Sequence, residues 1–257
     1  MQKILPCGQI DVDPELMDAV VTRVHRHNLS LPYWAAREHA YLSSDDNDRF
    51  SALDMLNHTT FRELGFADLL TRIWDEMLID VPQRPRLRLA PARVAGQEGA
   101  ELYVREHLRT VILRVRADRF EQVESLSLFL RREFLHIADM YDSDFGYRPN
   151  LVIPDDLAWM KKALAERYRI LWDTVVDGRL LRWNLAPADV KPSRWRDFAR
   201  TFDVLGNECR PAFEWWFIHS SPCHSVLSEF ARSPLESWMR QHTLRHEPAV
   251  EVYDGTV

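Results

Sequence analysis

The spacing of apolar residues changes once along this chain, and that change is the strongest constraint on its fold. At two places within the segment 85–115, apolar residues recur at every second position, which is typical of a strand with one buried face. From residue 120 to 142 the interval becomes three to four, as in an amphipathic helix. The alternating positions are Leu87, Leu89, Val111, Leu113 and Val115. We therefore expect two strands and a following helix that packs on their sheet.

Helical spacing also dominates the rest of the chain. The apolar run 210–219 is expected to be buried. A helix that starts near Asp155 is expected to end at Asp177-Gly178, because glycine adopts the left-handed conformation of a helix end. The expected helices cover residues 13–27, 61–78, 120–142, 155–176 and 194–205. The sequence thus predicts an α+β protein that is mainly helical, with one small sheet packed against a helix.

The chain is expected to form one domain. Its 257 residues, 46% of them hydrophobic, are enough for a sizeable core, and its loop-like segments, such as 91–101, are short. Within residues 1–257 we expect a helical N-terminal portion over 1–80, a core over 85–180 and a helical C-terminal portion over 181–257.

Charge and cysteine content narrow the classes of function. The net charge of −6, from 33 basic and 39 acidic residues, argues against nucleic acid as a partner. No apolar run approaches the roughly 20 residues of a membrane span, and no apolar signal core precedes the first acidic residues. Cys7, Cys209 and Cys223 are too few and too far apart for a disulfide framework. We therefore expect a cytoplasmic protein with reduced thiols and no membrane partner.

The helix of residues 120–142 carries the main candidate site. The stretch LRREFLHIADMYDSDFGY contains Arg132, Glu133, His136, Asp139 and Asp142. Residues four apart share one face of a helix, so side chains at positions 132 and 136 point the same way. Imidazole and carboxylate groups bind zinc and harder divalent metals, and a carboxylate beside the metal can activate bound water.

These residues resemble the extended motif of the metzincin branch of the zincin metallopeptidases, His-Glu-x-x-His-x-x-Gly-x-x-His or Asp, which follows a strand. The resemblance covers roughly residues 85–160. It implies that Glu133 is the general base, that His136 and Asp142 are metal ligands, and that Met160 lies beneath the metal. It also implies zinc or another divalent metal as cofactor, and metal-assisted hydrolysis of a peptide or amide bond in a peptide or protein substrate.

Two positions depart from the family pattern. Arg132 replaces the first histidine ligand, and a guanidinium stays protonated and has no lone pair for a metal. Asp139 replaces the glycine at the turn, although aspartate enters left-handed conformations less readily. Both changes affect the chemistry of the motif more than its fold.

The departures leave several interpretations open. In the first, His136 and Asp142 hold a metal, and Asp139 or a more distant acid supplies the missing ligand. In the second, the protein is an inactive zincin relic, a pseudoenzyme without metal, in which Arg132 replaces the metal charge by pairing with Asp139 or Asp142. Its exposed sheet edge would then bind a peptide or partner protein. The distant acids considered are Asp173 and Asp177, four residues apart.

Two further interpretations do not involve a zincin. A helical non-haem di-iron site normally requires a second Glu-x-x-His, and the sequence has none. Alternatively, His136 is a hydrogen-bonded core residue and the aspartates belong to the following turn. A second group, Cys209, His219, Cys223 and His224, is of zinc-binding type but fits no finger or ribbon spacing. We expect this second group to be structural.

Overall fold

The computed structural model describes residues 10–28, 31–42, 45–81, 83–105, 108–148, 158–219 and 222–243. The chain divides into two compact units, Met1–Tyr141 and Asp142–Val257. The first unit contains a small mixed sheet with helices, and the described part of the second is helical. The predicted fold class, a mainly helical α+β protein, is confirmed. The boundary between the units lies within the segment 85–180, which was expected to form one core.

The sheet of the first unit has four strands in the order β1-β2-β4-β3. Strands β1, β2 and β4 are parallel, and the edge strand β3 is antiparallel to β4. The two strands predicted from alternation, β2 and β4, are confirmed, and the five alternating residues that predicted them are fully buried. Strand β3 was missed, because it begins inside the segment 91–101 that we expected to be a loop. The strands are β1 (Ile10–Val12), β2 (Arg86–Pro91), β3 (Gly99–Arg105) and β4 (Leu108–Val115).

Five α-helices accompany this sheet: α1 (Pro14–Asn28), α2 (Leu31–Tyr41), α3 (Asp46–Glu63), α4 (Phe66–Met77) and α5 (Val123–Tyr141). Short 3₁₀ helices lie at Ala95–Gln97 and Ala117–Glu121. Asp45 caps α3 by accepting the backbone N–H of Asn47 at 2.7 Å. The segment 61–78, expected to be one helix, is divided because Gly65 adopts a left-handed conformation with φ 77°.

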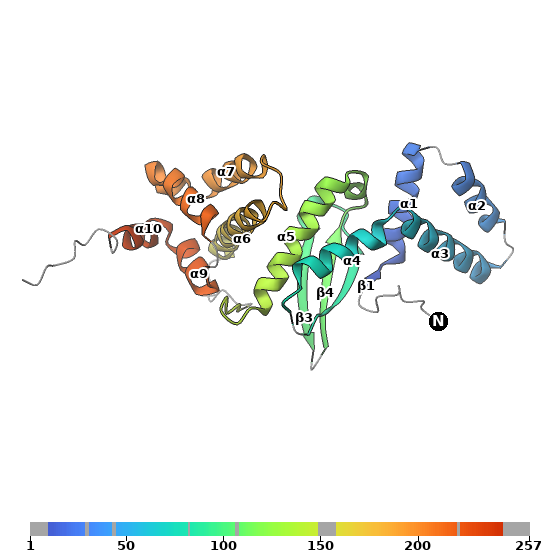
Figure 1. Ribbon diagram of the computed structural model, residues 1–257, viewed down its shortest axis with the longest axis horizontal. Coiled ribbons are helices and arrows are strands. Elements are labelled where there is room, and N and C mark those ends of the chain that lie inside the picture. The colour runs from blue at the N-terminus through green and yellow to red at the C-terminus, as the bar shows by residue number, and fades with distance from the viewer. Residues whose placement is uncertain are drawn as a thin grey trace, which may run out of the picture. The chain divides into compact units, whose positions relative to one another are not determined.

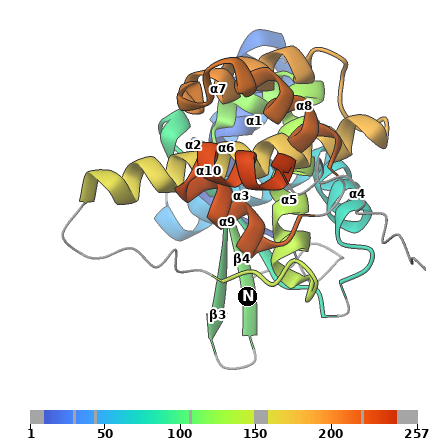
Figure 2. The same cartoon turned by 90° about the vertical axis from the view of Figure 1, so that its left-hand side faces the viewer.

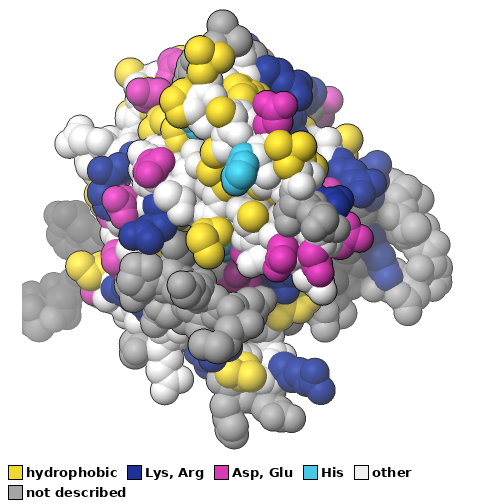
Figure 3. Space-filling model, turned by 90° about the vertical axis from the view of Figure 1, so that its right-hand side faces the viewer, with side chains coloured by type: hydrophobic (Ala, Val, Ile, Leu, Met, Phe, Trp, Pro, Cys, Tyr) yellow, Lys and Arg dark blue, Asp and Glu magenta, His cyan; other side chains and the backbone are white. Residues whose placement is uncertain are grey.

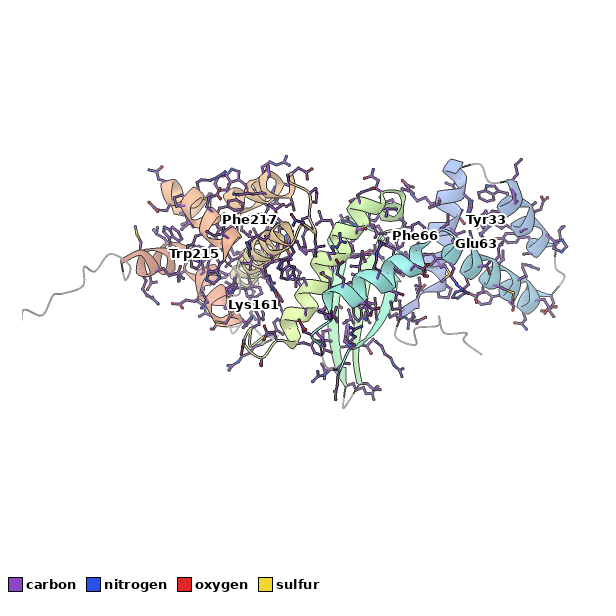
Figure 4. All side chains as sticks on the ribbon, in the orientation of Figure 1. Tyr33, Glu63, Phe66, Lys161, Trp215 and Phe217 are labelled. Carbon is purple, nitrogen blue, oxygen red and sulfur yellow. The ribbon has the colours of Figure 1, made fainter. Side chains whose placement is uncertain are left out.

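Helices α4 and α5 pack side by side, and α5 also packs against the sheet (Figure 1). The ring of Trp74 on α4 meets that of Phe134 on α5 edge to face, with centroids 4.8 Å apart. Phe66, labelled in Figure 4, packs in the same way against Phe120 at 5.1 Å. The predicted packing of the helix at 120–142 on the sheet is confirmed, and α5 makes this contact through the edge strand β3.

The second unit is built around one long helix, α6, which contacts α7, α8 and α9 (Figure 2). The prediction that this helix ends at Gly178 is wrong, since α6 continues to Arg182. A Cβ at Gly178 would lie 1.8 Å from the carbonyl oxygen of Phe217, so the glycine permits a close approach of α6 and α8. The helices are α6 (Ala158–Arg182), α7 (Val190–Thr201), α8 (Cys209–Ile218), α9 (His224–Arg232) and α10 (Pro234–Thr243), with a 3₁₀ segment at Asp203–Glu208. The predicted helix at 194–205 overlaps α7, which ends at Thr201. The run 210–219 was expected to be buried, and α8 buries only Ala212, Phe213, Trp216 and Phe217 of it, whereas Ile218 is exposed.

Several large apolar side chains of the first unit are exposed. One group of them lies on α2, on α3 and just after the end of α2, and Figure 3 shows hydrophobic side chains interspersed with charged ones on this end of the unit. These residues are Leu31, Tyr41, Leu42, Phe50 and Met55. Among the described helices, none is long and apolar enough to cross a membrane.

Candidate functional site

Four of the five motif residues lie on α5. Arg132, His136 and Asp139 are spaced by four and three residues, so they share one face of the helix, with Glu133 next to it. Asp139 is buried, while the other three are half-buried. The helix is held in place by its opposite face, where Leu126, Leu130, Phe134 and Ile137 are fully buried. The amphipathic pattern in the sequence therefore places Arg132, His136 and Asp139 away from this apolar face, although Asp139 is still buried.

The carboxylate of Glu133 binds the edge of the sheet. Its Oε2 accepts the backbone N–H of Ala100, the second residue of β3, at 2.8 Å. The preceding residue, Gly99, has a φ of 142°, which side-chain-bearing residues rarely adopt. The glycine thus lets the chain enter β3 directly beside the carboxylate. Glu133 joins α5 to the edge strand.

A second contact joins the other end of α5 to the same hairpin. The guanidinium of Arg109 on β4 lies 4.9 Å from the ring centroid of Tyr141, the last residue of α5. Burial raises the pKa of the Tyr141 hydroxyl, and the charge of Arg109 partly offsets this. Arg109 is paired with Val104 in the antiparallel ladder. Helix α5 therefore runs alongside β3 from Ala100 to Val104.

The bond to Glu133 reveals which backbone groups of β3 point outward. In an antiparallel pair, residues alternate between those that bond to the neighbouring strand and those whose N–H and C=O point away from it. The N–H of Ala100 is directed at Glu133 and not at β4, so Leu102 and Val104 also direct their backbone groups outward. Beyond β3 the described residues provide no further strand. The hairpin of β3 and β4 projects past α4 and α5 in Figures 1 and 2.

The side chains of β3 present two different surfaces. Leu102 is half-buried and Val104 is 62% exposed on the face toward α5. On the other face, Tyr103 and Arg105 are exposed, and Glu101 accepts hydrogen bonds from the Tyr103 hydroxyl and from Arg114. These two bonds hold the pKa of the Glu101 carboxyl below its usual value. The edge is thus apolar on one side and aromatic and charged on the other.

Asp142 follows the end of α5 and begins a turn. Its Oδ1 accepts the N–H of Asp144 at 2.8 Å, and its carbonyl accepts the N–H of Gly146 at 3.2 Å. It belongs to the second compact unit, whereas His136 and Asp139 belong to the first. Within the described ranges, no three His, Cys, Asp or Glu side chains are arranged to hold a metal ion. Since Arg132 cannot bind a metal either, the donors fall short of the zincin set.

The more distant candidate ligands have another partner. Asp173 and Asp177 lie on α6 and both bind Arg194 of α7, at 3.1 and 2.8 Å. All three side chains are buried. Burial disfavours the charged guanidinium, but the two carboxylates outweigh this and raise the pKa of Arg194. The acids that were candidates for the missing ligand therefore neutralise a buried arginine within the second unit.

The remaining candidates are dispersed over the second unit. Met160 is exposed and lies on α6, not in a turn. Nδ1 of His224 lies 2.7 Å from the hydroxyl of Tyr168, in a buried aromatic cluster, which agrees with a structural role. Cys209 is buried in α8, and Cys223 precedes α9 as its N-cap.

Strand β3 is the element beside the candidate site that the sequence analysis missed. Its residues Gly-Ala-Glu-Leu-Tyr-Val-Arg alternate in the same way as those of β4, with Leu102 and Val104 on one face and Tyr103 and Arg105 on the other. Gly99 and Glu101, at the start of β3, are residue types typical of loops. The period-two signal was present from Ala100 onward and would have identified the strand.

Comparison with known proteins found no family model, no curated protein and no solved structure that matches this chain. The arrangement of α5 and β3 is therefore the basis for any assignment of function.

Proposed function

We propose that the protein binds an extended peptide, which adds as a further strand to the edge of β3. The observation that carries this proposal is the hydrogen bond from Ala100 N–H to Glu133. In a zincin, the glutamate at this motif position would act on metal-bound water. Here the same carboxylate binds the edge strand, which supports a binding role for the motif helix and not a catalytic one.

The bond also limits where a peptide can pair. The outward N–H of Ala100 is already bonded, so the edge is closed at its start. The outward groups of Leu102 and Val104 remain for main-chain hydrogen bonds, which provide the affinity in strand addition. Because α5 runs beside this stretch, alternate peptide side chains would lie against the helix and over the open face of the sheet.

A proline scan of the edge tests this function. Val104→Pro removes one outward N–H, and proline is tolerated on the exposed side of an edge strand. The probe is an array of short peptides that alternate valine with glutamate, lysine or serine. We expect the unmodified protein and Val104→Ala to bind members of the array, and Val104→Pro to lose at least about tenfold in affinity, the equivalent of one or two hydrogen bonds. Equal binding by Val104→Pro, with an unchanged circular dichroism spectrum, would contradict the proposal.

Metal-assisted hydrolysis is the alternative function, since His136 and Asp139 share the face of α5 beside Glu133. The change Arg132→His restores the His-Glu-x-x-His face. A strand-binding protein without a metal should show zinc-dependent thermal stabilisation in Arg132→His and none in the unmodified chain. Equal stabilisation of both by zinc, lost in His136→Ala, would instead favour the metal-dependent function.

A further inference from the structure

We propose that the peptide bound by β3 is the segment 249–254 of a second copy of this chain, so that the protein associates head to tail. This inference rests on the proposed function. The segment reads Ala-Val-Glu-Val-Tyr-Asp and lies outside the described residues. Valine and tyrosine favour extended conformations, and the segment contains neither proline nor glycine.

The alternation of this segment matches the two surfaces of the edge. Leu102 and Val104 present apolar side chains toward the α5 side, two residues apart. Val250 and Val252 have the same spacing, so both would lie on that side when they pair with the outward groups of β3. Glu251 would then lie on the open face. An added strand shifted by one residue would exchange the two sets, which makes the register specific.

Charge favours the same register. The exposed Arg105 forms no ion pair within the part of the chain that the structure describes. Glu101 would be a weaker ion-pair partner for Arg105 than an acid on the added strand, because Glu101 already binds Arg114 and Tyr103. Glu251 would lie opposite Tyr103 and diagonal to both Arg105 and Glu101. Since the Glu101 charge is already paired with Arg114, the ion pair with Arg105 would outweigh the repulsion from Glu101. Tyr253, on the same face, would place a second aromatic ring near Tyr103.

A heterologous contact of this kind is open-ended, because each copy offers one edge and one segment. We therefore expect the mass measured by sedimentation to rise with concentration for the unmodified protein. The edge variant, Val104→Pro, and the segment variant, Val250→Asp with Val252→Asp, should each remain monomeric. Mixing the two variants supplies one intact edge and one intact segment, and should give a complex of one copy of each.

A charge exchange tests the register. Arg105→Glu alone and Glu251→Arg alone should each weaken association about two- to fivefold, the effect of one exposed ion pair. The double variant, Arg105→Glu with Glu251→Arg, should recover the affinity of the unmodified protein. Independent, additive losses in the double variant would overturn this register.

The outcomes separate this inference from the proposed function. If the mixed variants stay monomeric while the segment variant still binds the alternating peptide array through Val104, strand addition stands and the segment 249–254 is not its ligand. If neither the array nor the mixture shows binding that depends on Val104, both proposals fail. A synthetic peptide of residues 247–255 that binds the segment variant but not the edge variant would support both.

Discussion

In the first unit, Glu133 lies half-buried beside an open edge and accepts one backbone N–H, whereas in the second unit Asp173 and Asp177 are buried and share one guanidinium. All three acids are helical residues that the sequence offered as parts of one metal site. Their surroundings give them different roles. A carboxylate at an edge can organise a binding surface, while a buried pair of carboxylates requires a permanent cation.

The largest effect is expected from removing that cation. Arg194→Ala would leave Asp173 and Asp177 buried without their guanidinium, and should lower the free energy of unfolding by about 3–5 kcal/mol. Chemical denaturation would measure this change. The matched control is Arg200→Ala on the same helix, whose side chain is exposed and pairs only with Asp197 among the described residues. Equal stability of both variants would show that the cluster does not sustain the second unit.

A substitution at Gly178, where α6 and α8 approach closely, tests the packing of the second unit. Gly178→Ala places a Cβ against the carbonyl of Phe217, so the helices must separate. We expect a loss of about 1–3 kcal/mol, typical of overpacking. Gly96→Ala is the control, because a Cβ there meets nothing within 4 Å. A melting temperature of Gly178→Ala equal to that of Gly96→Ala would contradict the helix contact.

At the edge, the effect should be smaller. Glu133→Ala leaves the N–H of Ala100 without this acceptor and should cost about 1–2 kcal/mol, near the lower end for a hydrogen bond to a charged group because Glu133 is only half-buried. Glu133→Gln retains an acceptor oxygen and should lose less. Hydrogen exchange of the Ala100 amide measures the bond directly: it should be fast in Glu133→Ala and slower in Glu133→Gln. Slow exchange in both variants would show that another acceptor holds this strand.

The smallest expected effect is the loss of stability at acidic pH. Burial lowers the pKa of His224, and the charge of Arg148 lowers it further, whereas in the first unit burial lowers the pKa of His25 and Glu63 opposes the shift. A histidine whose folded pKa is depressed stabilises the fold above the unfolded value of about 6.5 and loses this contribution as pH falls. The free energy of unfolding should therefore decrease as the pH is lowered from about 7.5 to about 5.5, roughly one unit on each side of the unfolded pKa.

Matched variants assign this pH dependence. His224→Gln should flatten the slope more than His25→Gln does, because both of its causes act in the same direction. Urea unfolding at several pH values measures the slopes. A steeper slope in His224→Gln than in the unmodified protein would contradict the assignment.

The period of the apolar residues was sufficient to predict β2, β4 and α5, because burial of one face leaves a direct pattern in sequence. It did not reveal the role of Gly178, since a close approach of α6 and α8 depends on a carbonyl 39 positions away in the chain, that of Phe217. The partner of Asp173 and Asp177 was equally hidden, because Arg194 comes from another helix. Contacts of this kind belong to tertiary packing and have no local signal.

The candidate site was partly predictable, because helical spacing is also a local pattern in the sequence. Helical spacing placed Arg132, Glu133, His136 and Asp139 on one helix correctly. The acceptor role of Glu133 could not be read from that spacing, because it depends on where β3 lies. The metal ligands and the peptidase-like activity implied by the resemblance stay predictions.

The most direct test of strand addition at β3 is residue-resolved amide exchange with and without a short peptide of alternating valine and glutamate. If the peptide pairs with the edge, the amides of Leu102 and Val104 should become protected, while that of Tyr103, which already faces β4, should change little. Protection elsewhere, with Leu102 and Val104 exchanging as before at saturating peptide, would contradict the account.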